Sequence, residues 1–412
     1  MKPYAPYATL TYQRCQQLAQ FSQDPLCMDR RYLTKEHQQA NQQVMQWMQA
    51  AGMRSWQDEA GNQWGALHCH KPDSPTLVIG SHLDTVPNGG KYDGILGVLL
   101  PISLVQYFHD TGQSLPFNLQ IVGFGDEEGT RFGATLLGSR AVAGTWQENW
   151  SMLVDLEGIG LPHAMRNFGL DINRIGHCKR AQQIDAFIEI HIEQGPVLEA
   201  NNLAVGVVSA IAGARRFKCT LTGFAGHAGT VPMHMRQDAL AGAAEMIIAI
   251  ETLAKVHHVV ATVGKLTCLS GATNVISGKT EFSIDIRSEN DEQRDQAFSA
   301  IEQSINAIAQ ARKLTLHITQ THIASAVACD TNLKQQLRQA IIKQGISDFT
   351  LSSGAGHDTM AMANICPVGM LFMRCDKGIS HHPAEAIRTD DIEQTLAVLA
   401  DFLQDFALKQ EA

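Results

Sequence analysis

The sequence predicts an α/β protein whose larger domain has a mixed, largely parallel sheet and is interrupted by a smaller βαββαβ domain. The chain has 412 residues, which exceeds one comfortable hydrophobic core and favours two domains. Apolar strand-like runs alternate with helical patterns up to about residue 210, as is typical of parallel sheets. That order changes between residues 211 and 324 and resumes afterwards. We therefore expect one domain at 1–210 and 325–412, with an inserted domain at 211–324.

Composition excludes several classes of protein. Hydrophobic residues make up 44% and charged residues 18%, as in soluble globular proteins. The net charge of −9 and the lack of a Lys/Arg-rich run argue against nucleic-acid binding. The sequence shows no secretory h-region at its start and no 18-residue apolar run, so neither secretion nor a membrane span is expected. The nine cysteines are scattered without a C-x-x-C pair, which predicts reduced thiols and a cytoplasmic protein.

The first 124 residues contain the alternating elements of the larger domain. Residues 8–56 show helical periodicity, with an amphipathic helix that ends near Gly52. A short apolar run at Thr76–Ile79 predicts a buried strand, Ile95–His109 a helix, and Asn118–Phe124 a second strand. This strand–helix–strand order predicts parallel pairing of the two strands.

The stretch from Ser81 to Gly94 carries His82, Asp84 and Asp93 at the end of the first of these strands. Imidazole and carboxylate are ligands that Zn, Mn, Co and Ni accept, and Asp84 is placed to orient His82. The alternative is an ordinary strand end followed by an ordinary Pro-Asn-Gly-Gly turn. This stretch alone does not decide between the two.

Two further strand ends carry ligand-type residues. The strand at 118–124 runs into Gly125 and then Asp126, Glu127 and Glu128. A solvated loop would explain an isolated acidic triplet, but ligands of open α/β sheets bind at the carboxyl ends of strands. Residues 185–195 alternate strictly, so His191 shares a strand face with acidic neighbours. A cross-strand ion pair is the alternative role for His191.

The inserted region predicts the βαββαβ order of a ferredoxin-like unit. Its expected strands are 217–223, 259–269, 280–288 and 314–323, and its expected helices are 237–256 and 291–312. His227 lies on a glycine-rich loop, where a histidine is more often a plain surface residue. Arg287 lies beside Asp285 on the polar face of a strand, where it either binds a carboxylate or is an ordinary surface residue.

The last part of the chain brings two more glycine loops. One contains His357 and Asp358, and the other contains His381 and His382 after an apolar run at 368–372. His82, Asp93, the Glu127–Glu128 pair, His191 and one of the last two histidines therefore come from separate segments near strand ends. Several such segments in one α/β domain predict a metal site.

These segments also resemble a known family, the M20-type dinuclear metallohydrolases, and within it the amidase/hydantoinase/carbamoylase group. That group contains N-carbamoyl-L-amino acid hydrolases, allantoate amidohydrolases and β-ureidopropionases. The likeness covers essentially the whole chain. The motifs that carry it are Ser-His-Leu-Asp-Thr-Val at 81–86, Gly-Gly-Lys-Tyr-Asp-Gly at 89–94, Asp-Glu-Glu-Gly-Thr-Arg-Phe at 126–132, His-Ile-Glu-Gln-Gly-Pro at 191–196, Gly-His-Ala-Gly-Thr at 226–230, Thr-Asn-Val at 273–275, Ser-Gly-Ala-Gly-His-Asp at 353–358 and Ile-Ser-His-His-Pro-Ala-Glu at 379–385.

The resemblance implies two divalent metal ions per subunit, Zn, Mn, Co or Ni. It implies that Asp93 bridges both ions and that Glu127 is the general base. His381 is preferred to His382 because the family's ligand follows the serine directly. His82 and His191 are implied as ligands of one ion each, and Glu128 and His381 as the remaining ligands.

The resemblance also implies how a substrate is held. His227 would stabilise the oxyanion, reaching the site from the inserted lid and dimerisation domain of the other subunit, which implies a homodimer. Arg287 would bind the substrate carboxylate. The other implied substrate-binding residues are Gln194, Arg216, Asn274, Gly356 and His357.

The implied reaction is attack of water on a ureido carbonyl, with release of an amine, ammonia and carbon dioxide. A two-metal site polarises the carbonyl and lowers the pKa of a bridging water, whose proton Glu127 would take. An M20 aminopeptidase or dipeptidase with the same metals is the competing enzyme. A non-catalytic binding homologue would lack the base or a ligand, and every one of these positions is filled.

Overall fold

The computed structural model describes residues 3–69, 71, 73–180 and 183–406. The chain forms two compact units. The first contains residues 1–209, 329–351 and 356–412, and the second contains residues 210–328 and 352–355. Among the described residues, no helix is both long and apolar enough to cross a bilayer. The nine cysteines are free thiols.

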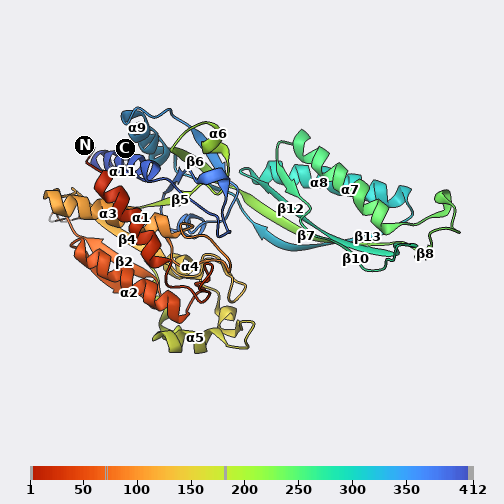
Figure 1. Ribbon diagram of the computed structural model, residues 1–412, viewed down its shortest axis with the longest axis horizontal. Helices are drawn as coiled ribbons and strands as arrows, with labels where there is room; N and C mark the ends of the chain where they lie inside the picture. Colours follow the sequence, from red (N-terminus) through yellow and green to blue (C-terminus); the bar gives the residue numbers. More distant parts are fainter. Residues whose placement is uncertain (1–2, 70, 72, 181–182, 407–412) are drawn as a thin grey trace. The chain divides into compact units, whose positions relative to one another are not determined.

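The first unit is built around the larger sheet, whose strand order is β1-β2-β4-β3-β5-β16-β6 with β14 next to β6 and β15 also paired to β6 (Figure 1). Its central strands β4, β3, β5 and β16 are parallel, and the flanking strands β2 and β6 are antiparallel to them. The strands of this sheet are β1 Arg54–Gln57, β2 Gln63–Leu67, β3 Thr76–His82, β4 Asn118–Phe124, β5 Ala186–Ile192, β6 Val205–Ile211, β14 Val327–Ala328, β15 Thr350–Ser353 and β16 Val368–Met373. The expected mixed, largely parallel sheet is therefore confirmed.

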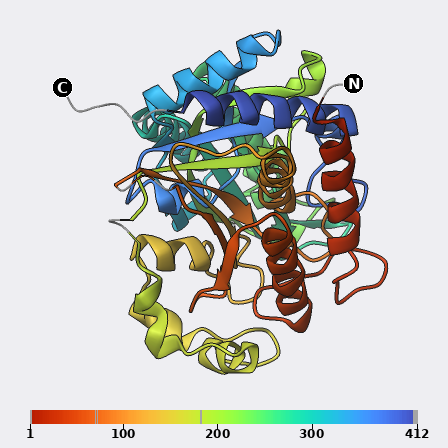
Figure 2. The ribbon, with the colours of Figure 1, turned by 90° about the vertical axis from the view of Figure 1, so that its left-hand side faces the viewer.

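Helices cover both faces of this sheet. Helices α1, α3, α9 and α11 pack against one another, and Figure 2 shows α9 and α11 in blue, side by side. On the opposite face α10 packs on β5 and β16 and contacts α4. The helices of this unit are α1 Ala5–Leu18, α2 Lys35–Ala50, α3 Ile95–Thr111, α4 Leu137–Ala143, α5 Leu161–Phe168, α6 Val197–Ala200, α9 Thr331–Lys343, α10 Thr359–Met362 and α11 Thr389–Asp405, with 3₁₀ turns at Glu148–Met152, Ile172–Cys178 and Asp376–Gly378.

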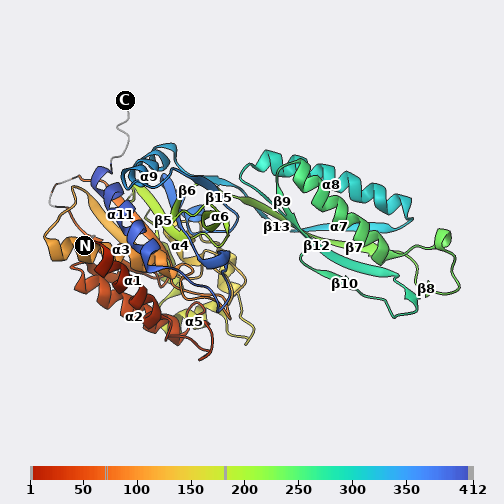
Figure 3. The ribbon, with the colours of Figure 1, turned by 45° about the horizontal axis from the view of Figure 1, so that its top comes forward.

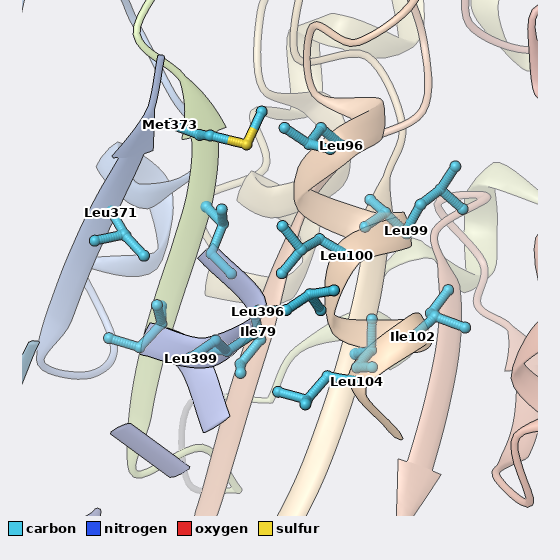
Figure 4. Packing of buried hydrophobic residues seen from close by; sticks show 14 of the residues in the cluster. Ile79, Leu96, Leu99, Leu100, Ile102, Leu104, Leu371, Met373, Leu396 and Leu399 are labelled. Atoms are coloured by element: carbon cyan, nitrogen blue, oxygen red, sulfur yellow. The ribbon is translucent and has the colours of Figure 1, made fainter. Parts of the chain in front are cut away.

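Helix α3 is the centre of the core. Its residues from Ile95 to Val105 are all buried, so it is apolar on every side, as expected of a helix enclosed by a sheet and other helices. Figure 4 shows Leu96 and Leu100 of α3 among Ile79 of β3 and Met373 of β16. This packing fixes the start of α3, which Asp93 precedes by two residues, against the end of β3.

The second unit has a five-stranded antiparallel sheet of order β10-β12-β7-β13, with β9 also paired to β12. Helices α7 and α8 contact each other and cover one face of this sheet (Figure 3). A separate two-stranded sheet pairs β8 with β11. The elements of this unit are β7 Gly213–Thr222, β8 Gly226–His227, α7 Ala239–Val256, β9 Val260–Thr262, β10 Leu266–Cys268, β11 Val275–Ile276, β12 Lys279–Ser288, α8 Asp291–Ala311 and β13 Thr315–Ala324, with a 3₁₀ turn at Met233–Met235.

Two expectations about local structure are wrong. The helical pattern over 8–56 is broken by irregular chain at 19–34 and by strand β1. The single strand expected at 259–269 is two short strands, β9 and β10, separated by residues 263–265 around Gly264. Both still pair with β12, so the break is a local interruption of the kind that glycine marks in strands.

Candidate metal centre

The four parallel strands of the first unit bring the expected ligands to one edge of the sheet. Strand β3 ends in His82, which lies opposite Phe124, the last residue of β4. The acidic loop 126–128 follows Phe124 after one intervening residue, Gly125. His191 of β5 lies opposite Phe372 of β16. Because parallel strands have their carboxyl ends at the same edge, these segments converge there.

Asp93 lies at the middle of this group. Its Oδ1 is 3.1 Å from Nε2 of His191 and 3.9 Å from Nε2 of His82. Its Oδ2 is 3.0 Å from Nε2 of His381. Nε2 of His381 is also 3.6 Å from Oε1 of Glu128. Asp93, His82 and His191 are at most 4% exposed, so three imidazoles converge on one largely buried carboxylate.

The ring orientation of the two buried histidines is set by backbone carbonyls. Nδ1 of His82 lies 3.0 Å from the carbonyl oxygen of Asp84, and Nδ1 of His191 lies 2.8 Å from the carbonyl oxygen of Ile192. Such a contact fixes the tautomer and leaves Nε2 as the ligand atom. The carboxylate of Asp84 is 3.6 Å from Nδ1 of His82 and instead accepts the N–H groups of Glu127 and Glu128 at 3.1 and 3.3 Å. Asp84 thus joins the β3 end to the acidic loop.

Glycine is required at two positions around Asp93. Gly94 has φ of +69°, and a Cβ there would lie 2.4 Å from the ring of His82. At Gly90 a Cβ would lie 2.1 Å from Cδ of Glu385. Side chains at either position would displace a ligand or its support.

Glu385 is a largely buried carboxylate that holds the Asp93 loop against the His381 loop. Its Oε1 accepts the N–H of Tyr92 at 2.8 Å and the N–H of Asp93 at 3.2 Å. The hydroxyl of Ser380 lies between Oε2 of Glu385 and Oδ2 of Asp93, 3.1 Å from each. Two loops 292 residues apart in sequence are therefore fixed to each other by one side chain.

The charges in this group perturb one another. Burial, together with the charge of Asp93, raises the pKa of Glu128 to about 7. The hydrogen bond to Asp93 raises the pKa of His381 to about 9. Burial opposes ionisation of Asp93, but His191 and His381 outweigh it and hold the pKa of Asp93 well below its usual range. Burial raises the pKa of Glu127 well above its usual range. Such a cluster of acids and histidines is what a divalent cation stabilises.

The geometry of the donor atoms fits a metal site. The ligand atoms of His82, Asp93 and His191 lie within 4.8 Å of one another, and so do those of Asp93, Glu128 and His381. The two groups share Asp93. Imidazole nitrogen and carboxylate oxygen are suitable donors for Zn, Mn, Co and Ni.

The other expected residues of the first unit lie around this group. Gln194 donates to Oδ2 of Asp93 at 3.0 Å and to Ser380 at 3.1 Å. The ring of His357 packs edge-on against that of His191 at 4.6 Å, and burial lowers the pKa of His357. A Cβ on Gly356 would lie 3.8 Å from Oε1 of Glu127. His382 is exposed, and its Nδ1 accepts the N–H of Ala384.

Four of the expected substrate-binding residues lie in the second unit and form two pairs: His227 with Asn274, and Arg216 with Arg287. Asn274 precedes Val275, which lies opposite His227 in the β8–β11 pair, and the carbonyl of Asn274 accepts the N–H of Ala228 at 2.9 Å. Arg216 and Arg287 both contact Asp285, at 2.9 Å and 2.8 Å. The residues of each pair therefore lie close together, but the two pairs are separated along the length of β7 and β12.

Several residues that connect the segments of the site by hydrogen bonds were not predicted from the sequence. Glu385 and Ser380 lie in the family motif at 379–385, and Asp285 lies beside Arg287. Glu189 is one of the acids that share a strand face with His191. Its buried carboxylate accepts the Ser81 hydroxyl at 2.8 Å and the N–H and hydroxyl of Thr359 at 2.9 and 2.7 Å. Motif membership was the available signal for Glu385 and Ser380.

Comparison with known proteins places the chain in a family. Residues 78–405 match the family model described as peptidase family M20/M25/M40. The chain belongs to this family. Among curated relatives, an N-carbamoyl-L-amino-acid amidohydrolase of Pseudomonas sp. (strain NS671) is 39% identical over 87% of this chain and 88% of the relative. A probable allantoate deiminase of Oryza sativa subsp. japonica is 35% identical over 98% of this chain and 89% of the relative.

The fold is similar to that of solved members of the same group. A crystal structure of an amidase of the hydantoinase/carbamoylase family from Burkholderia multivorans superposes with a TM-score of 0.91, at 29% identity over 96% of this chain and 97% of that one. The M20 protein described here is thus an enzyme, a hydrolase of a metal-dependent family, and its candidate ligand groups include the two that share Asp93.

Proposed function

We propose that this M20 hydrolase cleaves the ureido (carbamoyl) C–N bond of N-carbamoyl-L-amino acids or allantoate and releases ammonia and carbon dioxide. The observation that carries the proposal is the ligand cluster around Asp93 with Glu127 beside it, in a chain whose relatives are named for this chemistry.

Two divalent ions are proposed because two donor groups share one carboxylate. His82, Asp93 and His191 would hold one ion, and Asp93, Glu128 and His381 the other. When bound, a pair of such ions polarises a carbonyl and makes water more acidic. Asp84, Gln194 and Glu385 hold these ligands in place.

Glu127 is the proposed general base. It follows the same strand as the ligand Glu128, its N–H is held by Asp84, and its ligand atom lies within 4.8 Å of those of His82 and Glu128. Burial raises its pKa, which suits a group that takes a proton from water and passes it to the leaving nitrogen.

The distance between the expected substrate-binding residues supports a site that is shared by two subunits. Thr222 pairs with Lys279 at one end of β7 and β12, and Arg216 pairs with Asp285 six residues along. At about 3.3 Å per residue, these positions are roughly 20 Å apart. His227 lies beyond the Thr222 end (Figure 3). A small ureido acid cannot span that distance, so a site that uses His227 with Arg287 takes them from different copies of the chain.

We propose accordingly that the enzyme is a homodimer in which His227 and Asn274 act on the partner's substrate. The tip that carries them exposes Phe224, Met233 and Met235 by 65–76%, and such apolar exposure is typical of interaction surfaces. In this proposal residues 211–324 are the ferredoxin-like lid and dimerisation domain. The nine free thiols support a cytoplasmic location.

The function is tested with a substrate panel. The purified protein, loaded separately with Mn, Co, Ni and Zn, is assayed for ammonia release from allantoate and N-carbamoyl-L-amino acids, and for cleavage of dipeptides. Ammonia release from ureido acids is expected. Cleavage of dipeptides alone would assign the chain to the peptidases of its family, and no release by metal-loaded protein would exclude the proposal.

The shared site is tested by mixing two inactive variants, Glu127→Gln and His227→Ala. A mixed dimer contains one site in which both residues are intact, so random exchange of subunits should restore about a quarter of the wild-type activity. Recovery of no activity, with exchange verified by mass, would show that His227 acts within its own subunit.

A further inference from the structure

A cavity of about 990 Å³ in the second unit is lined by Arg216, Asp285 and Arg287 of the polar sheet face that α7 and α8 leave uncovered. It also reaches His258 after α7 and Gln293 of α8. Phe282, Ile284 and Ile286 of β12 point to the helices and are buried. The alternate residues therefore point to the open face. Arg216 lies directly opposite Asp285 across the strands, and Arg287 is on the same face two residues along.

Asp285 holds both arginines. Its Oδ1 accepts Nε–H of Arg287 at 2.8 Å, and its Oδ2 accepts Nη2–H of Arg287 at 2.8 Å and Nε–H of Arg216 at 2.9 Å. Nη1 of Arg287 also donates to the carbonyl of Gly354. An arginine has five N–H donors, so two remain on Arg287 and four on Arg216. Both guanidinium groups are thus oriented and still able to bind an anion.

The charges around the cavity leave a net surplus of one positive charge. Its charged lining consists of Arg216, Lys265, Arg287, Asp285 and Glu289, with His258 counted as neutral. Three cations and two carboxylates give +1. Asp285 is ionised, because the arginines outweigh the effect of burial and lower its pKa. A surplus of one charge matches a ligand with one carboxylate.

We propose that Asp285 is a specificity-determining residue that orients Arg216 and Arg287 and restricts the cavity to ureido acids with a single carboxylate. The inference rests on the proposed function and deepens it. N-carbamoyl-L-asparagine carries one negative charge, and N-carbamoyl-L-aspartate has nearly the same shape with two. The wild-type enzyme should favour the first. Asp285→Asn raises the surplus to two charges and should favour the second.

The test compares kcat/KM for these two compounds in the metal-loaded dimer. In Asp285→Asn the aspartate-to-asparagine ratio should rise about tenfold, since the group is partly exposed and solvent screens it. This increase in the ratio should be smaller at 0.5 M salt than at 0.05 M salt, because the screening length is shorter. The matched control is Glu281→Gln, which removes a carboxylate from the same strand face where it pairs with Lys218 at 2.9 Å, outside the cavity lining. That control should leave the ratio unchanged.

A role in folding alone would lower both rates together and leave the ratio constant, which would overturn the proposal. If Asp285→Asn does not fold, Arg216→Gln lowers the surplus to zero and should shift the ratio the opposite way. An unchanged ratio there would equally refute the charge argument.

Calorimetric binding of the two compounds to Glu127→Gln enzyme, with and without the Asp285 change, separates the two proposals. It measures charge selectivity without turnover. If the wild type hydrolyses no ureido acid but the binding ratio shifts, the proposed function fails and the role of Asp285 stands. If the wild type hydrolyses them and the ratio does not shift, only the inference about Asp285 fails.

Discussion

The ligand cluster of the first unit and the polar sheet face of the second hold their charged groups in different surroundings. His82, Asp93 and His191 are at most 4% exposed and are fixed by backbone carbonyls and by Glu385. In the second unit Arg216 and Arg287 are 48% and 28% exposed, and Asp285 is their shared partner. Burying the charged groups of the first arrangement costs desolvation free energy, and their contacts fix them in place without substrate. The arginines of the second arrangement stay partly hydrated and can bind a substrate. Changes to the first should therefore affect chemistry and metal binding, and changes to the second should affect substrate binding.

The largest effect is expected for Glu127→Gln. The side chain keeps its shape but cannot accept a proton, so kcat should fall by about 10²–10⁴-fold, the usual contribution of a general base. The ligands are untouched, so metal content measured by elemental analysis should equal that of the wild type. Near-normal kcat in this variant would remove Glu127 from the role of base.

The support of the cluster is tested by Glu385→Leu and Glu385→Gln. Leucine leaves the N–H groups of Tyr92 and Asp93 without their acceptor, and loss of such support typically weakens metal binding by about 10–100-fold. Glutamine keeps Oε1 as acceptor and can donate to Ser380, so its effect should be small. Competition with a chelator measures the affinities. Equal losses in both variants would show that the charge of Glu385 matters and its hydrogen bonds do not.

The comparison also shows what sequence can reveal. The strands near the cluster were predictable because their apolar runs contain or lead into acids or a histidine, as at Asn118–Phe124 and residues 126–128. The helix expected at 95–109 corresponds to α3, because its apolar pattern is also strong. Strand β6 was not predicted, because its Val-Gly-Val-Val run has no period that separates it from a buried loop.

The roles of Glu385 and Asp285 could not be predicted because each depends on contacts across the fold. Asp93 and Glu385 are 292 residues apart, and Asp285 meets Arg216 through a strand register that residue pattern alone does not fix. Residues near 137–178 form short helices and 3₁₀ turns, which are too short to show a helical period.

In the second unit, Arg287→Ala should weaken substrate binding. A hydrogen bond to a charged group is worth about 1.5–3 kcal/mol, which corresponds to a rise in KM of roughly 10–150-fold. The kcat should change little, because the ion cluster and Glu127 stay intact. Steady-state kinetics on the best ureido acid of the panel separate the two constants. A fall in kcat with unchanged KM would place Arg287 among the groups that act in the transition state.

The smallest effect concerns His37, which is fully buried beside Gly125, the residue before the acidic loop, and it tests whether this histidine is neutral. Nδ1 of His37 accepts the N–H of Leu33 at 3.2 Å, and burial lowers its pKa to about 4. The unfolded chain binds a proton near pH 6.5 and the folded chain does not, so stability is full above that pH and decreases as the pH falls. Between pH 7.5 and 6 the loss should be about 0.8 kcal/mol. Denaturant unfolding of metal-free wild type and His37→Asn at both pH values measures it: asparagine can still accept from Leu33 but does not titrate, so its loss should be smaller by that amount. Identical pH dependence in the two proteins would mean that the pKa of His37 is the same in the folded and unfolded chains, so that burial does not keep it neutral.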